Sequence, residues 1–282
     1  MSILTYFARA FVAGERVNDA VKVVRRLNQK GIMATLDILG ENVKDARMAE
    51  SAVNAYIELL DVIAKEGINS NVSLKLTQMG LDIDYNFCLE NIRRIAKKAL
   101  DTGNFVRIDM EGSFYTQKTL ELFKEVFKDY KNVGIVIQAY LKRSYDDVKE
   151  LNQLGARIRL CKGAYKEPPE IAYKKMKEIR ENFLRISEIL FEDGNYPAFA
   201  THDTYLINRI KEMAKNMKKR NEDFEFQMLF GIRPKTQQRI AEEGYRMRVY
   251  VPFGTHWLPY FYRRLRERKE NVFFVLKNLF KR

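Results

Sequence analysis

Eight short apolar runs alternate with eight helical segments along this 282-residue chain, and that alternation limits the possible folds more than any other feature. The runs have the length of strands, and the segments between them place apolar residues at helical spacing. Strands that alternate with helices are joined in parallel, so the sequence predicts an α/β protein. Eight repeats in a chain of this length predict a (β/α)8 barrel.

The boundaries of these elements follow from glycine, proline and polar residues between the runs. Pro252 and Gly254 are expected to end the last strand, and a final helix is expected from Leu258. We expect one domain over residues 1–282, with residues 1–30 as a short N-terminal helical segment. The expected strands cover residues 32–39, 72–76, 105–109, 133–137, 156–160, 197–200, 224–228 and 246–251, and the expected helices cover residues 4–27, 46–66, 86–100, 116–128, 146–154, 170–190, 206–220 and 235–243.

A doubly wound open sheet is the rival fold. It is disfavoured because no Gly-x-Gly-x-x-Gly follows the first strand and no Walker loop is present. Composition does not distinguish the two folds, but it limits the function. The net charge of +13 allows an anionic small molecule, a nucleic acid or an anionic membrane surface as ligand.

Cysteine content and hydropathy indicate a cytoplasmic protein. Cys88 and Cys161 lie far apart, and no signal-like apolar region is present, so a reducing compartment is expected. No apolar run reaches the roughly 18 residues that a membrane span requires. Any membrane contact is therefore expected to be peripheral, at the inner face of the cell membrane, with the basic helix at residues 211–220 as the candidate surface.

Polar residues gather at the predicted ends of the strands. In a barrel these ends and the loops after them build one shared mouth, where active sites lie. Each such residue alone has a structural explanation, such as a helix cap or a salt bridge at the rim. Eight strand ends with polar residues together indicate a functional site, made of Asp37, Lys75, Asp109 with Glu111, Gln138, Arg159 with Lys162, Thr201 with His202, Gln227 and Tyr250.

Metal and thiol chemistry at this mouth has weak support in the sequence. The two histidines, His202 and His256, have no second His or Cys at metal-ligand spacing, so zinc is not expected. Asp109 and Glu111 together are a weak candidate for a magnesium site. Cys161 lies beside cations but lacks an evident histidine partner, which makes it a weak candidate nucleophile.

Two other chemistries stay open at this stage. Lys75 or Lys162 could act as the Schiff-base amine of a cofactor-independent lyase of the aldolase type. Arg159, Lys162 and the backbone of Gly163 could instead bind the phosphates of a cofactor, or stabilise a reduced, anionic flavin ring.

The C-terminal helix carries an unusual polar face. Tyr260, Arg263, Arg264 and Glu267 follow at i, i+3, i+4 and i+7, so they share one side of the helix. An arginine fork matches a carboxylate with two parallel hydrogen bonds, so this face is suited to a small anion. The alternative is an ordinary solvated basic helix.

Eight motifs in barrel order resemble the FAD-dependent proline dehydrogenase family, of the monofunctional bacterial type. RL-x-KGAY and PY-x-x-RRL-x-ER are the most specific, and the resemblance runs from about Phe11 to the C-terminus. The motifs are ATLDILGE at residues 34–41, SLKL at 73–76, RIDME at 107–111, IQAY at 137–140, RLCKGAYKEP at 159–168, ATHD at 200–203, FEFQMLFG at 224–231 and YVPFGTHWLPYFYRRLRER at 250–268.

The resemblance implies a distorted (β/α)8 TIM-like barrel with a final helix placed over the mouth, where FAD binds. It implies oxidation of L-proline to Δ1-pyrroline-5-carboxylate, the first step of proline catabolism, with hydride transfer to FAD and electrons passed to a membrane quinone. It also implies roles for single residues. Asp109 and Arg159 would be catalytic.

The substrate residues that the resemblance implies are Lys75 beside Asp109, Arg263 and Arg264 on the carboxylate, Tyr250 and Tyr260 along the ring, and Leu229 over it. The implied cofactor residues are Met110, Gln138, Arg159, Cys161, Lys162, Gly163, Thr201, His202 and Glu267. Cys161 stands where an aliphatic residue is usual in the family. Asp109 is not expected to act as the base, because a carboxylate paired with Lys75 is ionised.

A basic RNA-binding module is the reading from a different functional class. It is disfavoured because Lys and Arg are spread along the chain and no RNA-binding signature is present. We therefore expect no nucleic-acid partner.

Overall fold

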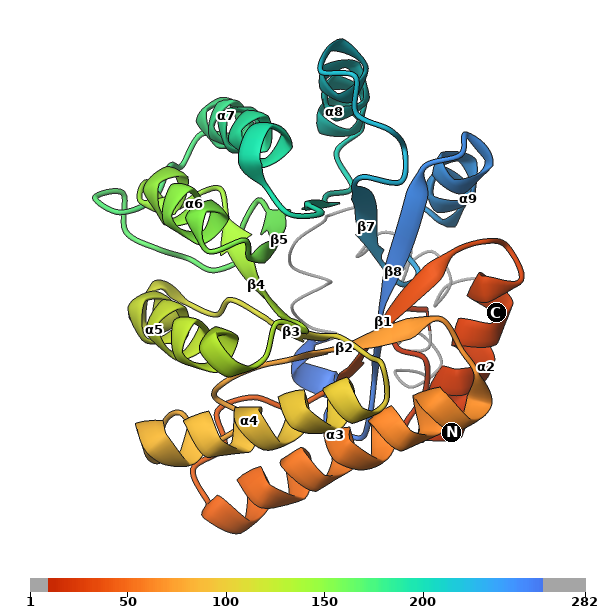
Figure 1. Cartoon of the computed structure of the whole chain (residues 1–282), viewed down its shortest axis with the longest axis vertical. Coiled ribbons are helices and arrows are strands. Elements are labelled where there is room, and N and C mark those ends of the chain that lie inside the picture. Colours follow the sequence, from red (N-terminus) through yellow and green to blue (C-terminus); the bar gives the residue numbers. More distant parts are fainter. Residues whose placement is uncertain (1–9, 261–282) are drawn as a thin grey trace, which may run out of the picture.

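The computed structural model describes residues 10–260, and these form a closed barrel of eight parallel strands surrounded by helices (Figure 1). The strands follow sequence order around the barrel, and β8 pairs with β1. The predicted fold class is confirmed. The strands are β1 (Met33–Ile38), β2 (Ser70–Leu74), β3 (Val106–Ile108), β4 (Val133–Gln138), β5 (Arg157–Cys161), β6 (Ala198–Ala200), β7 (Glu225–Leu229) and β8 (Arg246–Phe253).

The helices that connect the strands lie on the outside of the barrel. The α3 helix matches its predicted range because both ends carry strong signals: Asp45 caps the first turn by accepting from two backbone N–H groups, and Gly67 takes the left-handed conformation at the end. The helices are α2 (Val17–Asn28), α3 (Ala46–Glu66), α4 (Tyr85–Asp101), α5 (Ser113–Asp129), α6 (Ser144–Gln153), α7 (Met176–Asp193), α8 (Thr204–Asn216) and α9 (Pro234–Glu242).

Three predicted helix boundaries were wrong by four residues or more. The helix predicted over residues 4–27 begins only at Val17 within the described chain, because Gly14 breaks the path with a φ of 134°. The helix predicted from residue 170 begins at Met176, because the segment before it pairs with the loop after β4 through an Ala172–Leu141 bridge. The α8 helix ends at Asn216 and not at residue 220, since a turn with Lys218 at positive φ follows.

The predicted end of the last strand was also wrong, because β8 continues through Pro252 to Phe253. Pro252 has no N–H to donate, but none is needed on that side of the strand. The neighbouring strand β7 pairs with β8 only as far as Tyr250. The Pro252 carbonyl instead accepts from the N–H of Ala13, which holds the N-terminal segment against the barrel.

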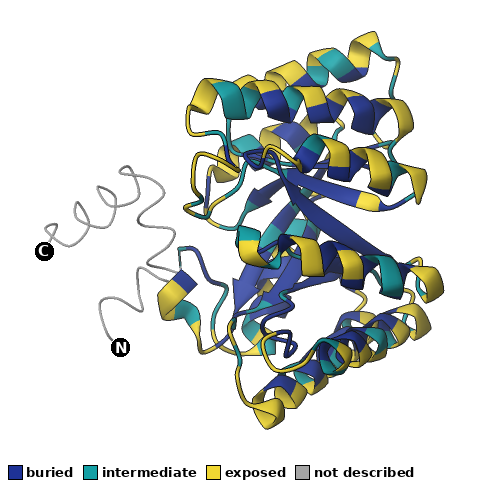
Figure 2. Cartoon of the chain, turned by 90° about the vertical axis from the view of Figure 1, so that its left-hand side faces the viewer, coloured by how far each residue is buried: buried dark blue, intermediate teal, exposed yellow. Residues whose placement is uncertain are grey.

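The two faces of each strand differ in character. Side chains that point outward are apolar and pack on the helices, which places the core between sheet and helices (Figure 2). Barrel interiors are usually filled by branched aliphatic residues. Alternate residues along each strand face the lumen, and in this barrel those inward positions are largely polar. They include Thr35, Asp37, Asn71, Ser73, Arg107, Asp109, Gln138, Arg159, Glu225, Gln227, Arg248 and Tyr250.

The helices at the two ends of the chain differ from the rest. The α2 helix precedes β1 and packs beside β1 and β8. After β8 the chain becomes helical at residues 257–260. Arg263, Arg264 and Glu267 lie outside the described residues, as does the expected course of the final helix over the mouth. Within residues 10–260, no helix has the length and apolar character needed to cross a membrane.

Candidate active site

Asp109, directly after β3, is the centre of the polar network in the mouth. One of its oxygens accepts hydrogen bonds from the Ser73 hydroxyl at 2.7 Å and from Arg159 Nη1 at 2.8 Å. The other accepts from the Tyr250 hydroxyl at 2.7 Å. Strands β2, β5 and β8 thus send one donor each to a carboxylate at the end of β3. The structure brings together Asp109, Arg159 and Tyr250, as the sequence predicted.

Lys75 lies one residue beyond β2 and is held between two carboxylates. Its Nζ is 3.2 Å and 3.3 Å from the two oxygens of Asp37, and 3.8 Å from Asp109. Burial lowers the pKa of Lys75, but Asp37 and then Asp109 raise it more, so the net pKa lies above the usual value. The Lys75 amine therefore carries a charge, and its nearer partner is Asp37 and not Asp109.

Asp37 is fully buried, and this burial raises the pKa of its carboxyl against the opposing effect of Lys75. The hydroxyl of Tyr56, on α3, lies 3.3 Å from Asp37 and donates to the Ser73 carbonyl at 2.7 Å. A helix outside the barrel thus fixes the ends of β1 and β2.

Arg159 has more hydrogen-bond donors than it has acceptors among the described residues. Its side chain is 5% exposed, and Nη1 alone is engaged, by Ser73 and Asp109. Nε and Nη2 are buried and have no partner among the described residues. The guanidinium carbon lies 5.4 Å from the centre of the Tyr250 ring. Buried N–H groups without acceptors are unfavourable, so these donors indicate that a ligand with acceptor atoms belongs beside Arg159.

The loops after β2, β3 and β4 are tied together by Glu111. Its carboxylate accepts from the backbone N–H of Thr77 at 3.1 Å and from the Thr77 hydroxyl at 2.6 Å. Its backbone carbonyl accepts from Gln138 Nε2 at 2.9 Å. Burial raises the pKa of Glu111, while the bonds from Thr77 oppose that rise. Met110, between Asp109 and Glu111, is 6% exposed.

The loop after β5 is packed against the loop after β4. Gly163 has a φ of 110°, and a Cβ at this position would lie 2.2 Å from the Tyr140 ring. The Tyr140 N–H also donates to the Lys162 carbonyl at 2.9 Å. Only glycine fits where the ring covers the backbone so closely. Gly163 therefore has a structural role whether or not it contacts a cofactor.

Glu167 fixes the same loop to α5, a role that was not predicted from the sequence. Its carboxylate accepts from the Ser113 N–H at 2.8 Å, from the Ser113 hydroxyl, and from the Tyr140 hydroxyl at 3.4 Å. The first turn of α5 thus receives its cap from a distant loop, since Gly112 has no side chain to supply one. Glu167 joins the loops that follow β3, β4 and β5.

Lys162 and Cys161, two of the predicted cofactor residues, lie in surroundings that make their side chains less reactive than the nearby cations in the sequence suggest. Lys162 pairs with Asp203 at 3.3 Å, and Arg180 shares that carboxylate at 2.9 Å. Burial alone would raise the pKa of Asp203, but these partners lower it. Burial raises the pKa of the Cys161 thiol to about 12, although Arg159 opposes this rise. A neutral thiol is a poor nucleophile, so these surroundings give no support to a thiol mechanism at Cys161.

The ends of β6 and β7 supply His202, Thr201 and Leu229. His202 Nε2 accepts from the Leu229 N–H at 2.9 Å, so the ring proton is assigned to Nδ1. The Thr201 hydroxyl accepts from the Asp203 N–H at 3.1 Å. Leu229 packs beside Tyr260, which is 7% exposed, in a small apolar cluster apart from the main core.

Residues that the sequence reasoning left without a role complete the site. Ser73 bonds to both Asp109 and Arg159, Asp37 holds Lys75, and Glu167 anchors the loop. A signal was present for Ser73, because it lies two residues before Lys75 and so faces the same side of the strand. The carboxylates of Asp109 and Glu111, the weak magnesium candidates, each accept hydrogen bonds from protein donors. Within residues 10–260, no three His, Cys, Asp or Glu side chains are grouped to hold a metal.

A polar network at the carboxyl end of a (β/α)8 barrel, built from strand ends and holding unsatisfied buried donors, is the site of a barrel enzyme. Residues 20–277 match the family described as Proline dehydrogenase. The chain is 41% identical to Proline dehydrogenase 2 of Bacillus subtilis over 275 residues, which cover 98% of this chain and 91% of that protein. The chain belongs to the proline dehydrogenase family.

Two further comparisons agree with this assignment. The chain is 38% identical to the Proline dehydrogenase of Deinococcus radiodurans, over 97% of this chain and 90% of that protein. The crystal structure of proline utilization A (PutA) from Bdellovibrio bacteriovorus, inactivated by N-propargylglycine, superposes with a TM-score of 0.88 at 30% identity. That match covers 93% of this chain and 32% of the larger protein. The resemblance found in the sequence is confirmed at the level of family and fold.

Proposed function

We propose that this chain oxidises L-proline to Δ1-pyrroline-5-carboxylate, using FAD as the cofactor and a quinone as the final electron acceptor. Membership of the family supports the substrate and the reaction class. The observation that carries the proposal is the buried guanidinium of Arg159, with two unpartnered donors in the mouth.

The residues at the mouth fit a flavin. The free donors of Arg159 suit the polar N1–C2 edge of the ring, where a cation stabilises the reduced, anionic form. Gln138 ends β4, and Thr201 and His202 follow β6, so they lie on either side of β5 and would border the same ring. The chemistry that FAD supplies when bound is acceptance of a hydride from C5 of proline. The roles of Met110, Cys161, Lys162, Gly163 and Glu267 toward the cofactor stay predictions.

The charges of the residues in the mouth influence whether the amine of the substrate is protonated. Hydride loss from C5 requires a neutral ring nitrogen, so the site must not stabilise the ammonium form of proline. Lys75 and Arg159 contribute two positive charges, and Asp37 and Asp109 contribute two negative ones, so the central network is neutral. Such a network gives little electrostatic reason for the amine to stay protonated.

Asp109 acts in this proposal as an orienting group. Both of its oxygens already accept hydrogen bonds, from Ser73, Arg159 and Tyr250. A carboxylate with occupied lone pairs is poorly placed to remove a proton. Burial beside Asp109 raises the pKa of Tyr250 well above its usual value, so the phenol stays protonated and donates.

The substrate's carboxylate would be held by Arg263 and Arg264, which lie outside the described residues. Tyr250 and Tyr260 would line the proline ring, and Leu229 would pack over it. Leu229 and Tyr260 belong to one small apolar cluster, and this membership supports the arrangement.

The lyase reading receives no support from the lysines. A Schiff-base amine must be neutral to attack a carbonyl carbon. Lys75 is charged between Asp37 and Asp109, and Lys162 is paired with Asp203. Neither amine is in the apolar, cation-rich surroundings that would release its proton.

The absorption spectrum of the purified protein tests the proposal. A yellow protein whose flavin bands are bleached by L-proline without oxygen is the expected result. A colourless protein that cannot be reconstituted with FAD would refute the cofactor. A flavoprotein that proline leaves oxidised would refute the substrate. A borohydride-stable adduct on Lys75 or Lys162 would favour the lyase.

We also propose that the enzyme is cytoplasmic and makes peripheral contact with the inner face of the cell membrane, because a quinone acceptor lies in the bilayer. The basic segment at residues 211–220 is the candidate surface, but Lys211 pairs with Glu243 and Arg220 pairs with Asp223. This pairing reduces the charge that the segment offers. Sedimentation with anionic vesicles at low and high salt tests the contact, and equal recovery in the supernatant with and without vesicles would remove it.

A further inference from the structure

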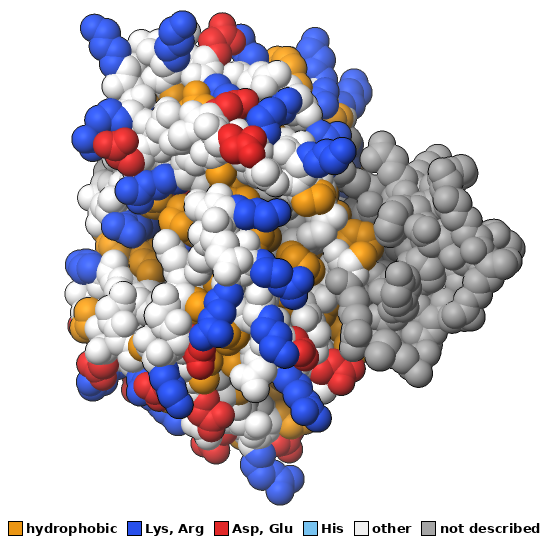
Figure 3. All heavy atoms as spheres, turned by 90° about the vertical axis from the view of Figure 1, so that its right-hand side faces the viewer, with side chains coloured by type: hydrophobic (Ala, Val, Ile, Leu, Met, Phe, Trp, Pro, Cys, Tyr) orange, Lys and Arg blue, Asp and Glu red, His pale blue; other side chains and the backbone are white. Residues whose placement is uncertain are grey.

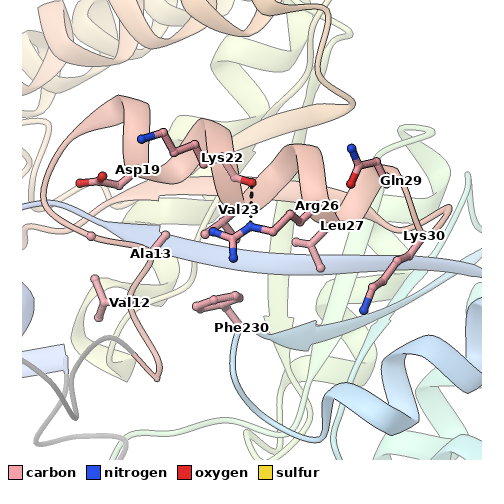
Figure 4. Close-up of a pocket in the computed structure, with 11 residues that line it drawn as sticks. Val12, Ala13, Asp19, Lys22, Val23, Arg26, Leu27, Gln29, Lys30 and Phe230 are labelled. Carbon is pink, nitrogen blue, oxygen red and sulfur yellow. Dashed lines mark hydrogen bonds between the residues drawn. The ribbon is translucent and has the colours of Figure 1, made fainter.

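A groove of about 720 Å³ lies outside the barrel, between α2 and the loop that follows β7 (Figure 4). Its walls come from residues 12–14, one side of α2 and Phe230. The groove shares no described lining residue with the Asp109 network, and none of those lining residues within residues 10–260 has a part in the proposed reaction. Its volume falls within the range of small-molecule sites in proteins.

The floor of the groove is apolar and rigid. Val12 and Val23 are 3% and 8% exposed, and Phe230 faces α2 from the opposite wall. Leu27 extends this surface along the helix. The backbone of Phe230 is fixed, because its N–H donates to the Tyr250 carbonyl at 2.9 Å. The floor is therefore preformed and needs no rearrangement to receive a hydrocarbon chain.

The rim of the groove is cationic. Lys22, Arg26 and Lys30 follow at intervals of four residues and lie along the groove in Figure 4. All three are exposed, and none of them forms an ion pair with a described carboxylate. Arg25, one residue away, differs because it pairs with Glu66 across to α3. The Arg26 Nε donates to the Lys22 carbonyl at 3.3 Å, which holds its guanidinium along the helix.

Asp19 is the one acidic side chain among the described lining residues, and it does not neutralise this rim. Asp19 stands at the first turn of α2, where its carboxylate accepts from the backbone N–H of Arg16 at 3.3 Å. The three cations lie further along the groove, on later turns. Figure 3 shows that Lys and Arg side chains are frequent on this side of the molecule and lie beside exposed hydrophobic ones.

The charges decide between possible occupants. A second copy of a chain with a net charge of +13 would place cations against cations. The C-terminal segment at residues 261–282 has eight Lys and Arg against two Glu, a net charge of +6, and is disfavoured for the same reason. A small inorganic anion would leave the apolar floor uncovered. The ligand that satisfies both surfaces has an anionic head and a hydrocarbon tail.

We propose that this groove binds one molecule of an anionic amphiphile, with its head on Lys22, Arg26 and Lys30 and its tail on Val12, Val23, Leu27 and Phe230. The head contributes exposed charge pairs, and the tail contributes burial of apolar surface. Both parts are needed for binding.

Calorimetry on the full-length protein with dodecyl phosphate, below its micelle concentration, tests this proposal. We expect a one-to-one complex. Inorganic phosphate, which has the head alone, and dodecyl maltoside, which has the tail alone, are each expected to compete poorly. A complex as tight with inorganic phosphate as with dodecyl phosphate would overturn the role of the floor.

Two matched triple variants test the rim. Lys22→Gln with Arg26→Gln and Lys30→Gln is expected to weaken dodecyl phosphate binding roughly tenfold to hundredfold, from three exposed charge pairs. Lys65→Gln with Lys128→Gln and Lys215→Gln removes the same charge from exposed positions elsewhere and is expected to leave binding within about twofold of the parent. Equal losses in the two variants would mean that net charge alone attracts the ligand, which would overturn the site.

A variant of the floor and a membrane comparison complete the test. Phe230→Ser is expected to weaken dodecyl phosphate binding while the weak affinity for inorganic phosphate stays unchanged. Anionic vesicles form the second arm. Sedimentation with vesicles but no one-to-one complex with dodecyl phosphate would replace the groove by general docking on a membrane surface, and would refute the proposal.

Discussion

Replacing Asp109 with alanine is expected to destabilise the protein far more than removal of a similar carboxylate at the surface. Asp109 is the ion-pair partner of Arg159 at 2.8 Å, and the two side chains are 14% and 5% exposed. Its loss leaves a buried guanidinium without a counter-ion, which costs about 3 to 5 kcal/mol. For a domain of this size the melting temperature falls by about 2 °C per kcal/mol, so we expect a fall of roughly 6 to 10 °C.

Asp147→Ala is the matched control. Asp147 also accepts three hydrogen bonds, all from Arg143, but that arginine is 43% exposed and regains water when its partner is lost. Because the cation of this pair is exposed, the pair contributes about 1 kcal/mol or less, although the Asp147 side chain itself is 9% exposed. Both melting temperatures are measured by circular dichroism at neutral pH. A fall for Asp109→Ala no larger than that for Asp147→Ala would show that the lumen is well hydrated and that the Asp109–Arg159 pair behaves as a surface pair.

Three further predictions follow from other parts of the structure. Gly163→Ala places a Cβ 2.2 Å from an aromatic ring at a φ of 110°. This variant is expected to lower the melting temperature by several degrees and to reduce the flavin content. In the control variant Gly112→Ala the nearest atom lies 3.5 Å from the new Cβ, so its melting temperature and flavin content are expected to be nearly unchanged. Glu225 is buried, and burial alone would raise its pKa, but the Arg248 guanidinium lowers that pKa below 4.5. The stability that this ion pair contributes is therefore present above pH 4.5 and is lost as the pH falls through the lower pKa of the folded state. The melting temperatures of the parent and of Glu225→Gln should therefore differ at pH 7 and converge as the pH falls below the lowered pKa of Glu225, and a constant difference would contradict the pairing. Arg263→Met and Arg264→Met are each expected to reduce kcat/KM for proline by about 2 to 5 kcal/mol, mainly through KM, and an unchanged KM in both would show that neither arginine holds the carboxylate.

The sequence predicted elements well where the signals that define them are local. The α3 helix was predicted residue for residue, because the Asp45 cap and Gly67 mark its ends within the segment itself. The α7 helix was predicted six residues too early, because residues that suit a helix are instead held in the loop by contacts with the segment after β4. Such contacts join residues distant in sequence, and no local pattern records them.

The same limit applies to the site. Their positions at the ends of predicted strands placed Lys75, Asp109, Arg159 and Tyr250 at one end of the barrel. The structure brings these four residues together. The resemblance implied Asp109 as the partner of Lys75, whereas Asp37 lies nearer in the structure, because the distances across a barrel lumen depend on register and tilt. Glu167 was missed for a different reason, since its partner is a helix terminus 54 residues earlier in the chain.

The polar lumen also has an evolutionary consequence. Hydrogen bonds connect the charged side chains inside the barrel into groups with their polar neighbours. Asp109, for example, accepts from Ser73, Arg159 and Tyr250 at the same time. Substitution of one member leaves its partners buried and unpaired, whereas exchange of a whole group for apolar residues is often neutral or favourable. Adaptation of this mouth to another substrate would therefore show strong epistasis: changes at Asp109 and Arg159 would be harmful singly and tolerated together. The outward positions of the same strands, such as Ile108 and Leu160, contact helices only through apolar packing and would vary nearly independently of the chemistry.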